Sequence, residues 1–277
     1  MKLKRIFAIV STLAILSVGS KPQAATAPRR GPFKTIPGGA RIYPKQIDAH
    51  VRYDLDPNTE GFFVYFPAAY NGRESYGLIV FTDSQDRALG LPWGWQAVLD
   101  SRKYIFIAAQ NAGNDQLRNR RLGLAVLGAL KLINEYRIDH NRVYAAGFSG
   151  GARMAGMLGF YQADVFRGTI QNSGVDFYRR VPIVAATSQL DTAGQPYGVF
   201  QASPEEIAGA KKVRFAIITG TNDFRRGNIL DIFHGGFERE RFQARLFDIP
   251  GMGHDVCDGR TLSQVLDFLE QPTRSIN

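Results

Sequence analysis

The pentapeptide at residues 147–151 (GFSGG) constrains the fold of this chain more than any other feature. A strand-like run precedes it at residues 142–146 (RVYAA), and a helix-like run follows it at residues 152–158 (ARMAGML). A G-x-S-x-G between a strand and a helix is typical of a nucleophile elbow, a tight turn that lifts a serine hydroxyl clear of the backbone. Gly147 and Gly151 suit such a turn, because a Cβ at either position would clash across it. The alternative is a plain glycine-rich turn, since the chain holds 29 glycines.

A secretory signal peptide is predicted for residues 1–27. Residues 1–5 (MKLKR) are basic, and residues 6–19 are apolar but too short to span a bilayer comfortably. Residues 25–27 (ATA) fit the small-x-small pattern of a cleavage site. We therefore expect a secreted or periplasmic protein with no stable membrane insertion after cleavage. An uncleaved N-terminal anchor is the alternative.

Residues 28–277 are expected to form a single domain, because about 250 residues suffice for one large core. Loss of residues 1–27 removes four basic residues and no acidic ones, which lowers the formal net charge from +9 to +5. No basic run is interleaved with aromatic residues, so we expect no nucleic-acid partner. Cys257 is the one cysteine, which rules out an intrachain disulfide and favours a packed structural thiol.

Strand-like and helix-like runs alternate after a Pro- and Gly-rich lead-in at residues 28–40, which is predicted to be extended and poorly ordered. The run at residues 76–82 (YGLIVFT) is continuously apolar, as expected of a strand covered on both faces. The alternation predicts an α/β fold with a mostly parallel central sheet and helices on both faces. The expected strands are residues 61–66, 76–82, 104–109, 142–146, 168–172, 213–219 and 242–249, and the expected helices include residues 96–102, 117–136 and 261–269.

A serine hydroxyl needs a base within hydrogen-bond reach and a third group that orients this base. His254 is the favoured base, because it follows the last expected strand in the glycine-rich residues 250–254 (PGMGH). Such a loop can return a side chain over the carboxyl edge of the sheet, where ligands bind in open α/β sheets. The other histidines are His50, His140 and His234.

The orienting acid should follow the strand before the last. Asp223 meets this condition in residues 220–223 (GTND), although an aspartate in a turn often serves only as a cap. Asp176 and Asp191 are the competitors. The order Ser149, Asp223, His254 is the chain order described for α/β-hydrolases.

These residues predict acyl transfer. Ser149 would attack a carbonyl, His254 would carry the proton, and Asp223 would orient the imidazole. The backbone N–H of Gly150 is expected to be one oxyanion donor. The second donor should come from residues 83–86 (DSQD), with Ser84 or Gln85 as the candidates.

Residues 139–155 (DHNRVYAAGFSGGARMA) resemble the elbow region of the α/β-hydrolase superfamily. The resemblance is greatest to the secreted esterases grouped with polyhydroxybutyrate depolymerases and feruloyl or acetylxylan esterases. Residues 220–223 and 251–254 (GMGH) resemble the acid and histidine loops of that group. The resemblance implies hydrolysis of small or polymeric esters without a cofactor. The chain departs from it at Asp83 and Ser84, where those relatives usually carry His-Gly.

Two tryptophans, Trp93 and Trp95, are candidate substrate-binding residues in a Pro/Gly-rich loop. They could stack on a substrate at the cleft or pack this loop onto the sheet. No His/Cys/Asp cluster has metal-ligand spacing, so no metal site is expected. The arginines after two strand ends are expected to be solvated at helix starts rather than to clamp a carboxylate; they are Arg118, Arg120, Arg121, Arg225 and Arg226.

Together these features predict a secreted or periplasmic serine esterase that works through an acyl-enzyme. An acyltransferase or a serine peptidase on the same fold would use the same three side chains. A non-catalytic binding protein that kept the fold is the alternative from another class, supported only by the departure at Asp83 and Ser84.

Overall fold

The computed structural model describes residues 34–37, 55, 60–86, 90–185, 188 and 198–271 of the 277-residue chain. The predicted signal peptide, His50 and Asp191 lie outside these residues. Within them, no helix combines the length and the apolar character that a membrane span requires.

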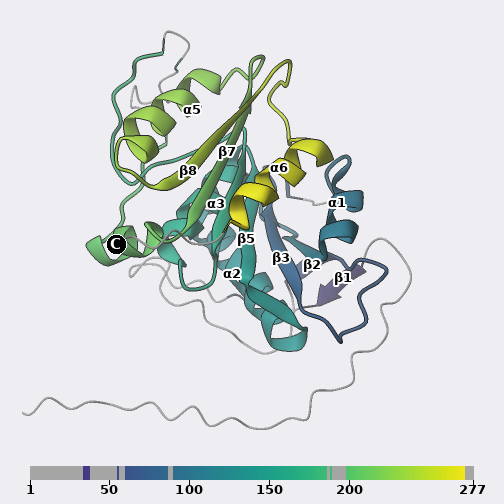
Figure 1. Ribbon diagram of the computed structural model, residues 1–277. Coiled ribbons are helices and arrows are strands. Elements are labelled where there is room, and N and C mark those ends of the chain that lie inside the picture. Colours follow the sequence, from purple (N-terminus) through teal and green to yellow (C-terminus); the bar gives the residue numbers. More distant parts are fainter. Residues whose placement is uncertain are drawn as a thin grey trace, which may run out of the picture.

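The core of the molecule is an eight-stranded sheet with the spatial order β1-β2-β4-β3-β5-β6-β7-β8 (Figure 1). The first two strands, β1 and β2, pair antiparallel, and β2 also pairs antiparallel with β4, whereas all other neighbours pair parallel. The prediction of a mostly parallel sheet is therefore confirmed. The strands are β1 (Lys34–Pro37), β2 (Gly61–Tyr65), β3 (Tyr76–Thr82), β4 (Tyr104–Ala109), β5 (Ile138–Phe148), β6 (Gly168–Asn172), β7 (Arg214–Gly220) and β8 (Gln243–Ile249).

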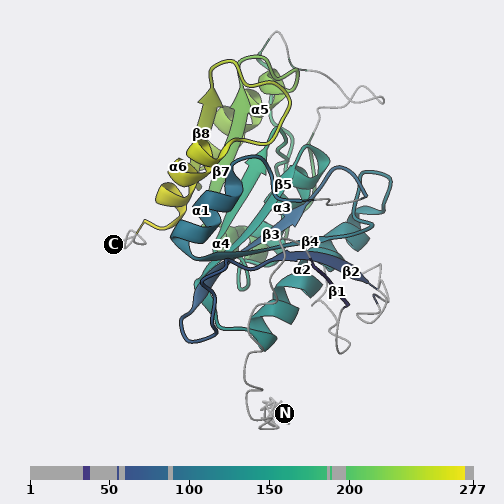
Figure 2. The same ribbon diagram turned by 90° about the vertical axis from the view of Figure 1, so that its right-hand side faces the viewer.

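Helices cover both faces of the sheet, as Figures 1 and 2 show. Side chains on successive positions of a strand point to opposite faces. Accordingly, Leu78 and Val80 of β3 pack into the core cluster that contains α2 and α3, while Ile79 and Phe81 pack into the cluster that contains α1 and α6. The helices are α1 (Trp95–Arg102), α2 (Arg118–Glu135), α3 (Gly150–Tyr161), α4 (Pro204–Ala210), α5 (Arg226–Ile232) and α6 (Gly259–Leu269), and a π-helical turn, η1 (Phe233–Glu238), follows α5.

The predicted strands agree with the structure to within a few residues, but several elements were missed. The short strand β1 lies inside the lead-in that was predicted to be extended and poorly ordered, and it pairs there with β2. The helix α4 begins with a capping box between Ser203 and Glu206, a signal visible in the sequence. His234 lies in the π-helical turn η1, where its exposed side chain contacts Glu238.

Candidate active site

Ser149 lies in a strained turn between β5 and α3. Its backbone has φ 52° and ψ −116°, a conformation that a non-glycine residue rarely adopts. A Cβ on Gly147 would lie 2.4 Å from the backbone of Gly151, and a Cβ on Gly151 would lie 1.9 Å from the carbonyl oxygen of Thr82. The backbone N–H of Ser149 donates to the carbonyl of Asn172 at 2.8 Å. The two glycines thus allow the turn, and the neighbouring strand β6 holds the serine in place.

His254 and Asp223 complete a chain of hydrogen bonds that begins at Ser149. The Nε2 atom of His254 lies 2.9 Å from Oγ of Ser149. On the other side of the ring, Nδ1 lies 2.8 Å from Oδ1 of Asp223. Asp223 follows β7 and His254 follows β8, so the parallel sheet brings three distant parts of the sequence to one edge. The competitor Asp176 pairs with Arg153 instead.

The carboxylate of Asp223 is fully buried. Its Oδ1 also accepts the backbone N–H of Arg225 at 2.9 Å, and its Oδ2 accepts the hydroxyl of Thr219 at 3.1 Å. Burial by itself would raise the pKa of Asp223, but the hydrogen bonds from His254 and Arg225 outweigh it and hold this pKa below its ordinary value. Asp223 is therefore an anion at neutral pH and favours a positive charge on the imidazole.

Two aromatic rings flank the imidazole of His254. The ring centroid of Phe148 lies 5.2 Å from that of His254, and the centroid of Phe224 lies 4.3 Å from it. The side chain of His254 keeps 19% of its surface exposed, so the ring is still partly open to solvent. Sequence analysis missed both phenylalanines, although Phe148 directly precedes Ser149 and Phe224 directly follows Asp223.

The loop after β3 packs against the first turn of α3, where the backbone N–H of Gly150 has no intrahelical acceptor. A Cβ on Gly151 would meet the backbone of Thr82 and, at 3.1 Å, that of Asp83. The carboxylate of Asp83 folds back on its own loop and accepts the N–H of Gln85 at 3.1 Å. Of the two residues considered as a second oxyanion donor, Gln85 therefore already has an acceptor for its N–H.

Arg121 braces this loop. Its side chain donates to the carbonyl of Ala112 at 2.7 Å and to the carbonyl of Asp83 at 3.0 Å, and only 5% of the residue is exposed. Burial, and then the nearby charge of Arg153, lower the pKa of Arg121 to about 10. The prediction of a solvated arginine is therefore wrong for Arg121, because its guanidinium satisfies two buried carbonyls. Arg120 is half-buried and forms two hydrogen bonds with Glu60.

The two tryptophans have different surroundings. Trp95 is 0% exposed, its indole N–H donates to the carbonyl of Cys257 at 2.7 Å, and its ring packs edge-to-face on Phe81 and Phe106. The assignment of Trp95 as a substrate-binding residue is therefore wrong, because its ring is enclosed in the core at the start of α1. Trp93 is 83% exposed and remains accessible to a ligand.

Cys257 is buried beside the site, and burial raises the pKa of its thiol. A thiol kept protonated is a poor nucleophile, which supports the prediction of a packed structural cysteine. Among the residues that the structure describes, no three histidine, cysteine, aspartate or glutamate side chains are grouped to hold a metal ion.

A pocket opens directly beside Ser149, between the end of β6 and the start of α5. It is a small recess, with room for little more than one water-sized group. Arg153 lies on its wall and forms an ion pair at 2.5 Å with Asp176, whose side chain is fully buried. Sequence analysis had not assigned a site here. The pocket is lined by Ser149, Arg153, Ser173, Gly174, Val175, Arg225, Asn228 and Ile229.

One curated relative and many solved structures resemble this chain, whereas no family model matches it. Over 145 residues the chain is 30% identical to a poly(3-hydroxybutyrate) depolymerase of Ralstonia pickettii. This match covers 42% of the chain and 29% of the relative, so the chain spans less than a third of that protein's length.

The solved structures establish a likeness of fold. A ferulic acid esterase is 17% identical with a TM-score of 0.54, and the match covers 78% of this chain and 92% of that protein. An acylaminoacyl peptidase of Pyrococcus horikoshii is 15% identical with a TM-score of 0.55, and the match covers 90% of this chain and 43% of that one. At such identities the likeness concerns the course of the backbone alone.

Proposed function

We propose that this chain, which has the α/β-hydrolase fold and resembles its esterase group, is an exported serine esterase. The observation that carries the proposal is the continuous hydrogen-bonded line from Ser149 through His254 to Asp223, with the serine held at a positive φ. A strained backbone costs free energy, and such strain is concentrated at sites where geometry serves a function.

The reaction would proceed in two halves. Oγ of Ser149 attacks the ester carbonyl while its proton passes to Nε2 of His254, and the buried carboxylate of Asp223 stabilises the resulting imidazolium. His254 then protonates the leaving alcohol, and an acyl-enzyme remains on Ser149. In the second half, water attacks the acyl group, gives its proton to His254, and releases the acid as the serine recovers its proton.

The oxyanion of each tetrahedral intermediate would be held by backbone N–H groups. Gly150 supplies one from the first turn of α3. Ser84 is the second donor that we favour, because the N–H of Gln85 already donates to Asp83. This arrangement also explains how an aspartate is tolerated here: its charge is bound to its own loop and not aimed at the intermediate.

Exposed apolar side chains at the carboxyl edge of the sheet support a polymeric or other hydrophobic ester as the substrate. Trp93 is 83% exposed, Leu117 is 64% exposed and Phe224 is 53% exposed, and each lies between a parallel strand and the next helix. The relative from Ralstonia pickettii is named as a depolymerase of a polyester, poly(3-hydroxybutyrate). Export is supported by the N-terminal sequence.

The test is hydrolysis of 4-nitrophenyl butyrate by the purified mature protein, beside Ser149→Ala. We expect clear turnover by the wild type and a loss of about 10⁴-fold or more in kcat for the variant. A fluorophosphonate probe should label the wild type and leave the folded variant unlabelled. If both folded proteins were equally inert and unlabelled, the proposal of a catalytic serine would be wrong.

Two further substrates separate the alternatives on this fold. An acylated peptide 4-nitroanilide that is cleaved faster than the ester would indicate a peptidase. Butyl ester formed in the presence of added butanol, at the expense of butyrate, would indicate an acyltransferase. We expect neither result.

A further inference from the structure

We infer that the exposed ring of Phe224 binds the alcohol half of the ester, so that the natural substrate is the ester of a bulky apolar alcohol. This inference rests on the proposed function and narrows it to a class of substrate. Three features of the molecule carry it: the contacts of this ring, the turn that holds its backbone, and the small space beside Ser149.

The side chain of Phe224 lies on the catalytic base and not in the core. Its ring centroid is 4.3 Å from that of His254, and the two ring planes meet at 39°. The guanidinium of Arg225 lies 5.2 Å from the same centroid. With both contacts in place, Phe224 still keeps 53% of its surface exposed, and it belongs to neither of the two core clusters that the described residues form. Its ring therefore offers apolar surface to a ligand.

Phe148 shows how a supporting ring differs from this one. Its centroid lies 5.2 Å from that of His254, but Phe148 is half-buried and packs against the core cluster that contains α1 and α6. The imidazole is thus already joined to the core through Phe148. The ring of Phe224 is free to serve the substrate side of the imidazole.

The backbone of Phe224 is held by Asp223. The N–H of Arg225 donates to Oδ1 of Asp223 at 2.9 Å, and the N–H of Arg226 donates to the carbonyl of Asp223 at 3.0 Å. These two bonds close a turn around Phe224, directly before α5. A ring on such a turn keeps a fixed place beside the triad, which lowers the entropy lost when a substrate binds.

The reaction itself brings the alcohol to this place. Nε2 of His254 lies 2.9 Å from Oγ of Ser149 and gives its proton to the leaving oxygen, which must approach to about 3 Å. The carbon atoms attached to that oxygen then lie beside the imidazole. Because the ring of Phe224 contacts the same imidazole, an apolar alcohol can cover it.

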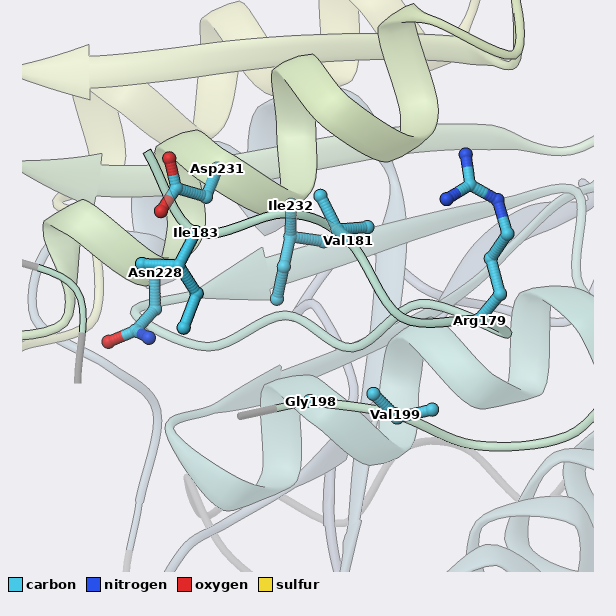
Figure 3. A pocket seen from close by; sticks show the side chains of 8 residues that line it. All are labelled: Arg179, Val181, Ile183, Gly198, Val199, Asn228, Asp231 and Ile232. Carbon is cyan, nitrogen blue, oxygen red and sulfur yellow. The ribbon is translucent and has the colours of Figure 1, made fainter. Parts of the chain in front are cut away.

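The recesses next to the nucleophile are too small to enclose such an alcohol. The one that contains Ser149 has room for little more than one water-sized group. The recess that follows along α5 shares Asn228 with it, is no larger, and contains no member of the triad (Figure 3). A bulky alcohol therefore has to lie across the exposed surface beside His254, where Phe224 stands.

Esters that differ in one half at a time test the inference. Methyl butyrate and benzyl butyrate differ only in the alcohol, and the two alcohols are of similar acidity. Both esters form the same butyryl-enzyme, so the alcohol can affect only the first half of the reaction, which kcat/KM reports. Methyl butyrate and methyl 4-phenylbutyrate differ only in the acyl group. We expect the wild type to prefer benzyl over methyl butyrate by about tenfold or more in kcat/KM.

The decisive variant is Phe224→Ala. It should lower the ratio of kcat/KM for benzyl over methyl butyrate by about 5- to 20-fold and leave the ratio of the acyl-side pair within about twofold of the wild-type value. Phe224→Tyr keeps the ring and should keep the wild-type ratios. Phe224→Leu keeps an apolar side chain and should lower the benzyl ratio by less, and it decides the matter if the alanine variant does not fold.

Val184→Ala is the control. It also removes an exposed apolar side chain, because Val184 is 83% exposed. This residue lines a groove that contains no member of the triad, and its backbone N–H donates to Asp231 at 3.1 Å. Both ratios should therefore stay at their wild-type values.

The outcomes separate this inference from the proposed function. A wild type without preference for the benzyl ester, or an equal loss on methyl and benzyl butyrate in Phe224→Ala, would overturn the inference and leave the esterase intact. A loss confined to the acyl-side pair would also overturn it, because the ring would then contact the acyl group. If no ester were hydrolysed in a Ser149-dependent way, the proposed function would fail, and the inference with it.

Discussion

The two sides of Ser149 use charged residues in opposite ways. On the oxyanion side, Asp83 and Arg121 are bonded to the loop after β3, so their charges brace backbone and point at no ligand. On the side of β6 and α5, Arg153 and Arg225 line an open pocket. On one side, charged groups hold a backbone loop in place, and on the other side two arginines line a small recess beside the serine. The nearness of a charge to a nucleophile does not reveal its role until its partners are known.

The largest effect should come from the hydrogen-bonded line of Ser149, His254 and Asp223, which lies between the two sides. Asp223→Asn should lower kcat by about 10⁴-fold on every ester, because an amide cannot hold the imidazole in the required tautomer or stabilise its charge. Steady-state kinetics on 4-nitrophenyl butyrate measure this loss. Asp248→Asn, which removes a half-exposed carboxylate at the neighbouring strand, is the control and should retain activity. A loss smaller than tenfold for Asp223→Asn would exclude Asp223 as the orienting acid.

On the oxyanion side, Trp95 should contribute strongly to the free energy of unfolding of the protein. Trp95→Ala removes a fully buried ring and its hydrogen bond to Cys257, so it should lower the free energy of unfolding by about 3–5 kcal/mol. Trp93→Ala removes an exposed ring from the same loop and should change that free energy by less than about 0.5 kcal/mol. Urea denaturation measures both. Equal effects of the two substitutions would contradict the placement of these rings.

A substitution of Arg121 tests whether this side chain holds the loop after β3 in place. Arg121→Met should lower kcat about 10- to 100-fold, because the carbonyl of Asp83 loses its donor and the loop that carries an oxyanion donor shifts. The loss should be similar for 4-nitrophenyl esters of different acyl-chain length, because all of them form the same oxyanion. Arg120→Met, on the same helix, is the matched control and should have little effect on kcat. A kcat unchanged by Arg121→Met would contradict the bracing role of this side chain.

The smallest expected effect is on pH-dependent stability. The pKa of Asp223 is lower in the folded protein than its ordinary value of 3.8. Its ionised form therefore stabilises the fold fully above the unfolded-state pKa, and this contribution is lost as the pH falls through the lower folded-state pKa. The stability difference between wild type and Asp223→Asn should shrink as the pH falls below about 4. A difference that grew as the pH fell below about 4 would contradict this sign.

Much of the site could be predicted from the sequence because its determinants are local. Gly147 and Gly151 mark a turn that only residues without Cβ can form, and that turn requires a serine between a strand and a helix. Continuous apolar runs marked β3 and β4 as strands buried on both faces. Once the strands were known, the order of a parallel sheet brought the loops of Asp223 and His254 to the same edge.

The errors have a different origin. Trp93 and Trp95 stand two positions apart in one loop, and local sequence carries no signal that one is enclosed by the core while the other faces solvent. From the sequence alone, Arg121 has the pattern of a solvated residue at a helix start. Its burial becomes evident only when the loop that contains Asp83 is seen to pack against it. The burial of a long polar side chain depends on what other segments present to it, and that information is spread over the whole chain.

For this protein, the sequence by itself determined the α/β-hydrolase fold, the elbow and the three residues that meet there. These follow from backbone sterics and from hydrophobic periodicity, which act over a few residues at a time. Only the tertiary structure decided which charged side chains brace backbone and which line the recess beside Ser149. Arg121 and Arg225 each occupy a helix start after a strand end, and they differ only in the groups that distant segments bring to them.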